Sequence, residues 1–114
     1  MINPGNYDLL CPQGVTFDKT FTWSNGGTAV NLTGYTAALQ VRSAYDADTA
    51  LISLTSGSGI TLGGTAGTIA VVISAAVTGA VDAGSYAWDL ELYSGSTTTR
   101  LLQGAFVVSG GVTR

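Results

Sequence analysis

The stretch GSYAWDLELYSGSTTTRLLQGAFVVS, residues 84–109, carries the clearest structural pattern in the chain. It predicts two strands joined by a polar, glycine-containing turn. In the first strand, an apolar row that includes Trp88 and Leu90 alternates with a polar row that includes Asp89 and Glu91. The second strand is apolar on both faces from residue 101 onward. Such a strand needs cover on both sides, which indicates a layered structure.

The register of this hairpin decides which face of its second strand is buried, because a slip of one residue inverts every side chain. An even loop would pair Glu91 with Arg100, and that ion pair contributes at most about 1 kcal/mol. An odd loop would bury Phe106 and set Gly104 opposite Trp88. Burying a phenylalanine contributes roughly 1.5–3 kcal/mol. We therefore predict the odd loop.

With that register, a small apolar strip lies on the outer face of the hairpin, bordered by acidic side chains. We predict that a second copy or another protein covers it, and that the strand also offers its main chain for pairing. In the alternative interpretation, the chain before Tyr7 or after Ser109 folds over the strip. The residues of this candidate assembly surface are Leu101, Ala105, Val107 and Ala87.

The rest of the sequence repeats the two-residue period of strands, punctuated by glycine-rich turns. Only residues 74–81 suggest a helical turn, with Ser74 as its cap. We predict one domain over residues 1–114, an all-β, two-layer antiparallel sandwich of immunoglobulin-like architecture with seven to eight short strands. The remaining expected strands span 7–11, 15–24, 35–43, 50–54, 60–62 and 68–73.

Composition excludes several classes of partner. Charged residues make up 10% of the chain, against roughly 25% in an ordinary soluble domain, and the net charge is −3. No basic stripe is present to bind a nucleic acid, and no apolar stretch is long enough to cross a bilayer. The amino terminus lacks the pattern of a secretory signal. We therefore expect a protein made in a cytoplasm, with a surface suited to packing against neighbours.

The sequence predicts no enzyme. Histidine, the commonest general base and metal ligand, is absent, and Cys11 has no histidine to activate it. Asp89 and Glu91 share one strand face, where carboxylates are usually solvated. Asp46 and Asp48 give only a weak calcium signal, because a site needs six or more oxygens. We expect no catalytic, cofactor-binding or metal-ligating residues and no cofactor.

Several motifs together resemble a known class of protein. The chain resembles the small β-sandwich structural proteins of tailed-phage virions. Its first forty or so residues are similar to the amino-terminal domain of baseplate upper proteins, which attach receptor-binding fibres. That family continues into a fibre-binding or coiled-coil extension, whereas this chain stops at Arg114, so the resemblance implies an attachment or covering module alone. The motifs are Pro12-Gln13-Gly14, Phe21-Thr22-Trp23, VNLTGY (30–35), QVR (40–42), ITLGG (60–64), Ala83-Gly84 before Tyr86 and Trp88, RLLQG (100–104) and VTR (112–114).

The resemblance implies a non-enzymatic virion structural protein, assembled in the host cytoplasm and located in the virion. The expected role is a tail or baseplate adaptor or accessory subunit. Its expected partners are other virion structural proteins or copies of itself, with no nucleic acid and no membrane. A capsid decoration protein is the alternative in the same class. A carbohydrate-binding module is the alternative from another class, with Tyr93 and Tyr45 as its candidate aromatic side chains.

Overall fold

The computed structural model describes residues 5–44 and 47–110, and strands are their main secondary structure. One short α-helix, α1 (Ala75–Gly79), and one 3₁₀ turn, η1 (Gly64–Ala66), interrupt them. The predicted all-β class is confirmed. The strands are β1 (Gly5–Asn6), β2 (Leu9–Pro12), β3 (Phe17–Thr22), β4 (Ser24–Asn25), β5 (Thr28–Ala29), β6 (Thr36–Arg42), β7 (Ile52–Ser56), β8 (Gly59–Leu62), β9 (Thr68–Ile73), β10 (Gly84–Ser94) and β11 (Thr97–Ser109).

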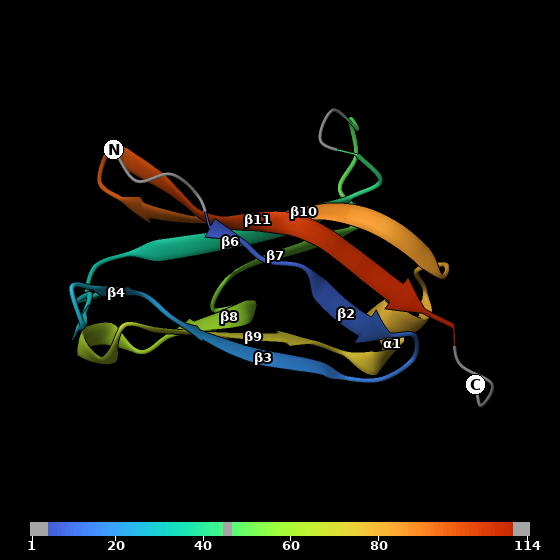
Figure 1. Ribbon diagram of the computed structural model, residues 1–114, viewed down its shortest axis with the longest axis horizontal. Coiled ribbons are helices and arrows are strands. Elements are labelled where there is room, and N and C mark those ends of the chain that lie inside the picture. The colour runs from blue at the N-terminus through green and yellow to red at the C-terminus, as the bar shows by residue number, and fades with distance from the viewer. Residues whose placement is uncertain (1–4, 45–46, 111–114) are drawn as a thin grey trace.

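The strands form two layers, as the sandwich prediction requires (Figure 1). Hydrogen bonding runs in the order β1-β11-β10-β6-β7-β8-β9-β3, with β2 also paired to β11. The sheet folds over between β7 and β8, so that β8, β9 and β3 lie beneath the layer formed by β11, β10, β6 and β7. The prediction of purely antiparallel pairing is wrong in part. β1 and β2 run parallel to β11, and β7 runs parallel to β8.

The core lies between the layers and is built by strand alternation. In β6, Ala37, Leu39 and Val41 point inward and are buried. In β9, the predicted span 68–73 is confirmed, with Ile69, Val71 and Ile73 inward. Other buried side chains join them from both layers: Leu9, Cys11, Phe17, Phe21, Leu32, Ile52, Ile60, Val81, Trp88, Leu90, Leu92, Phe106 and Val108.

The helix begins where the sequence predicts. Ser74 is its N-cap, and the Ser74 hydroxyl accepts a hydrogen bond from the Val77 amide at 3.3 Å. Within α1, Thr78 is buried and donates to the Val15 carbonyl at 2.8 Å. This bond fixes α1, which connects β9 to β10, to the segment that leads into β3.

The predicted odd loop of the long hairpin is wrong. Ser94 pairs with Thr97, which leaves a two-residue loop, and Glu91 pairs with Arg100 as an even loop requires. The register then shifts between Leu90 and Glu91. A two-residue loop is favoured because its twist matches that of the strands. Near the turn at Gly95, this preference sets the register in place of the burial of Phe106.

A β-bulge restores the predicted pairing further along the hairpin. Leu90 pairs with Leu102, so Leu101 is the extra residue. Beyond the bulge, Trp88 lies opposite Gly104, as predicted, and Phe106 is buried. The hairpin thus satisfies both the short turn and the burial of its largest side chain.

The outer edge of β11 is not free, which corrects the expectation that it offers main-chain pairing to a partner. The amino-terminal segment occupies it, with Gly5 paired to Leu102 and Leu9 paired to Phe106. Both pairs belong to one register, so β1 and β2 form a single strand with a kink at residues 7–8. That strand covers the edge of β11 from within the chain.

The kink is held by two hydrogen bonds around Gly104. The Trp88 indole Nε1 donates to the Tyr7 carbonyl at 2.8 Å, and the Ala105 amide donates to Asp8 Oδ1 at 2.9 Å. A Cβ atom on Gly104 would lie 2.8 Å from the Tyr7 carbonyl carbon and closer still to its oxygen. Glycine is required here because the backbone of the kink occupies the space of a side chain.

We expect Gly104→Ala to lower the free energy of unfolding by about 1–3 kcal/mol, the usual cost of overpacking. Chemical denaturation monitored by tryptophan fluorescence measures the change. Gly84→Ala is the matched control, because a Cβ atom at Gly84 on β10 meets its nearest neighbour only at 3.7 Å. Equal stabilities of the two variants would contradict the close approach at Gly104.

Cys11 lies on the inner face of β2 with 0% of its surface exposed, and burial raises the pKa of its thiol. Both effects suppress the reactive thiolate. We expect a disulfide-exchange reagent to leave Cys11 unmodified in the native protein and to modify it fully in denaturant. Reaction of the native protein at the rate of an unfolded chain would contradict this burial.

Candidate functional site

The structure divides the predicted assembly surface. Leu101, the residue of the bulge, packs against the hydrophobic core together with Leu102. Its predicted position on the outer face is therefore wrong, because the bulge turns it inward. Ala87, Ala105 and Val107 are half-buried, and Ala87 lies opposite Ala105 as predicted.

Leu10 takes the place of Leu101 on the outer face. Its neighbours in β2, Leu9 and Cys11, are buried, so alternation points Leu10 outward, where 64% of its surface is exposed. Parallel pairing sets it beside Val107. The alternation was readable in the sequence, but the strand that would lie beside residues 7–11 was not. We call Leu10, Val107, Ala105 and Ala87 the outer strip.

Two hollows lie between the outer strip and the helix, and the first is lined by polar residues such as Asn6, Asp8 and Ser85 as well as by two alanines of the strip. A shallow hollow over Ala87 and Ala105 is bounded by Ser43 and Tyr86. The same two residues border a second groove of about 570 Å³. Its apolar lining comes from α1, the segment that follows it and the residue before β7, namely Leu51, Ala76, Val77, Ala80 and Val81. Leu51 and Val77 are exposed, so this groove carries apolar surface of its own.

A polar network lies on the other side of the strip, on the same face. Arg100 contacts Asp89 at 3.5 Å and Glu91 at 3.4 Å, and the Tyr93 hydroxyl donates to Glu91 Oε1 at 3.0 Å. Burial raises the pKa of Asp89, and the charge of Glu91 raises it further, while Arg100 and Arg42 oppose the shift. Burial and the hydrogen bond to Glu91 raise the pKa of Tyr93.

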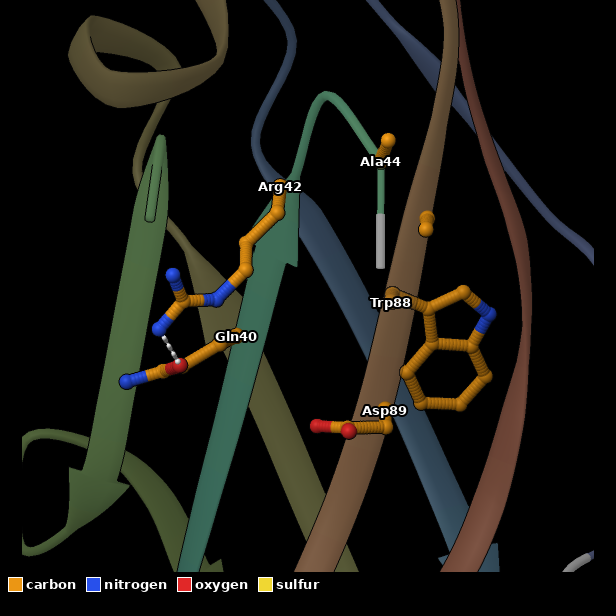
Figure 2. A pocket seen from close by; sticks show the side chains of 6 residues that line it. Gln40, Arg42, Ala44, Trp88 and Asp89 are labelled. Carbon is orange, nitrogen blue, oxygen red and sulfur yellow. Dashed lines mark hydrogen bonds between the residues drawn. The ribbon is translucent and has the colours of Figure 1, made fainter. Parts of the chain in front are cut away.

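Figure 2 shows the small pocket between β6 and β10, where the polar network meets the outer strip. Arg42 donates to the Gln40 side chain and to the Ala47 carbonyl, both at 2.7 Å. Asp89 projects toward Gln40, and Trp88 points the opposite way into the core. The pocket volume is about 60 Å³. This volume is well below the roughly 300–1,000 Å³ of ligand-binding clefts.

These groups give little basis for catalysis. The carboxylates of Asp89 and Glu91 are both bound to Arg100, so neither is positioned as an isolated acid or base. Across residues 5–44 and 47–110, no three histidine, cysteine, aspartate or glutamate side chains gather as metal ligands would. The calcium candidate includes Asp46, which lies outside the described residues, as do Tyr45 and the motif at 112–114.

Of the two aromatic side chains proposed for carbohydrate binding, Tyr93 lies within the described residues. Tyr93 is on the outer face, half-buried, with its hydroxyl on Glu91. In the part of the chain that the structure describes, no helix has the length and apolar character needed to span a membrane.

Comparison with known proteins gives structural likeness only. No protein-family model matches the chain, and no curated protein matches it. A solved structure from work on "multimeric cell-adhesive interactions of VGSC beta subunits" is similar at 13% identity, with 96% of this chain and 97% of that chain covered. The TM-score is 0.49, a likeness too low to bear on function.

Replacing Asp89 tests the polar network. A raised folded-state pKa means that the stability linked to this carboxyl is fully present below its unfolded value, near 3.8, and is lost as the pH rises. We therefore expect Asp89→Asn to be more stable than the parent at pH 7, with an advantage that shrinks toward pH 4. Thermal unfolding across this range measures it.

Asp18→Asn is the control, since it makes the same change of net charge at an exposed residue of the other layer. An Asp89→Asn variant that is less stable than the parent at pH 7 would show that the contact with Arg100 outweighs the cost of burial.

Proposed function

We propose that the protein is a non-enzymatic structural subunit of a tailed-phage virion, an adaptor or accessory protein of the tail or baseplate. The outer strip is its docking surface in this proposal. The observation that carries the proposal is Leu10, a leucine 64% exposed on the face of a regular strand beside Val107. An exposed leucine beside other apolar side chains on a strand face is typical of a protein contact.

The composition of the surface supports the same function. With charged residues at 10% of the chain, charge repulsion does little to keep neighbouring copies or partners apart. The outer strip and the groove beside Leu51 and Val77 form neighbouring apolar areas on one side of the molecule. The motifs that resemble those of phage β-sandwich proteins favour a virion as its setting.

The double variant Leu10→Lys with Val107→Lys tests this proposal. Both side chains are on the outer face, so the variant should fold and melt close to the parent, because charged side chains there stay in solvent. We expect it to be lost from particles assembled in a host that carries the gene with its neighbouring genes. Mass spectrometry of purified particles gives the amount of each chain.

Leu101→Glu is the matched control, because it places a charge on the inner side of β11 instead of the outer face. Leu101 is partly buried and packs against the core, so this variant should lower the melting temperature, unlike the double variant. Particles that lack the parent chain, or that take up the double variant as well as the parent, would overturn the proposal. Density for the chain on the shell instead of the tail would favour the decoration role.

A further inference from the structure

The sheet is open along one side. Within residues 5–44 and 47–110, β3 pairs with β9 on one edge and with no strand on the other. The Trp23 amide donates to the Gly67 carbonyl at 2.8 Å, which fixes the phase of the ladder. By the antiparallel alternation, the amide and carbonyl groups of Asp18, Thr20 and Thr22 point away from β9. β3 therefore presents a regular row of main-chain donors and acceptors.

A groove of about 370 Å³ follows this free edge. One wall is β3 and the residues just after it, 19–24, and the facing wall is formed by Tyr7, Leu101 and Leu102. Its volume is within the range of ligand-binding clefts. The bulge creates the second wall, because it turns Leu101 inward beside Leu102. The groove thus combines main-chain groups on one side with apolar side chains on the other.

Lys19 is the one charged residue that lines the groove. It lies on the inner face of β3, between Phe17 and Phe21, with its ammonium 5.2 Å from the centre of the Tyr7 ring. Lys19 is therefore an inward-facing charge on an edge strand. Phe21 stacks on Trp88, 5.9 Å between ring centres, which fixes the apolar part of the wall.

We propose that this groove binds an extended segment of a partner protein, which adds a strand to the free edge of β3. Main-chain bonds to Asp18, Thr20 and Thr22 hold it, and every second side chain enters the groove. Antiparallel pairing places an apolar side chain opposite Phe21 and, two residues later, an acidic one opposite Lys19. The recognised pattern is apolar-x-acidic.

The groove favours a free peptide arm over a second copy. The β3 strand of a second copy has Phe17, Lys19 and Phe21 on its inner face, so it would bring no carboxylate to pair with Lys19. A carboxylate on the arm also complements the one cation of the groove. This surface is separate from the outer strip, so the inference stands whether or not the proposed docking there is correct.

The experiment uses the synthetic peptide VTLTETV, capped at both ends, with the full chain labelled with nitrogen-15. We expect its binding to shift the amide signals of Asp18, Thr20 and Thr22. VTLTKTV is the matched control, with lysine in place of the acidic residue. It should bind about fivefold more weakly, the difference that one exposed charge pair permits. Titration calorimetry measures both affinities.

Lys19→Glu provides the charge swap. This variant should prefer VTLTKTV over VTLTETV, and its unchanged amide spectrum elsewhere would show that it is folded. Absence of binding, shifts confined to the outer strip, or a preference unaffected by Lys19→Glu would overturn the proposal. Concentration-dependent shifts at the same amides without peptide would also overturn it, since they would identify a second copy as the occupant.

Discussion

The hydrogen bond from the Trp88 indole to the Tyr7 carbonyl fixes the amino-terminal segment, and the rest of the surface depends on that segment. The bond forms because Gly104 leaves the space that the kink occupies. On both sides of the kink, β1 and β2 pair with β11 in one register. This register places Leu10 on the outer face and Cys11 in the core. The same bond holds Tyr7 near Lys19 as a wall of the groove.

Both proposed contact surfaces thus originate at one kinked strand but use different chemistry. The outer strip offers side chains, with Leu10 as its most exposed member. The groove offers main-chain groups of β3 together with one cation, Lys19. The two surfaces lie on different sides of the amino-terminal segment. A subunit with two such surfaces suits the role of an adaptor, which must hold two partners at the same time.

Much of the fold was predictable from local signals. Alternation identified β9 to the residue, and Ser74 was recognisable as a cap because its hydroxyl serves the next turn. The register of the hairpin was predictable only in part. The two-residue turn requires an even loop, whereas burial of Phe106 requires the pairing of an odd loop. The bulge at Leu101 allows both in one hairpin. A bulge has no signature in one sequence when the extra residue is itself apolar.

The candidate site was harder to predict, because it depends on long-range pairing. Alternation in β2 already implied that Leu10 faces away from Cys11, but nothing local indicated parallel pairing with β11. The same pairing closes the edge expected to be free and leaves the edge of β3 open instead. Sequence periodicity gives the faces of strands, whereas the order of strands in a sheet is set by contacts between distant segments.

Hydrogen exchange at the Trp88 indole tests the central claim most directly, since that N–H holds the kink. The chain has two tryptophans, and Trp23, which is half-buried, serves as the internal reference. The account predicts that the Trp88 indole proton exchanges as slowly as the core amides of β9, through global unfolding. Exchange as fast as that of Trp23, while the β9 amides stay protected, would contradict it, because the amino-terminal segment would then not be fixed on β11.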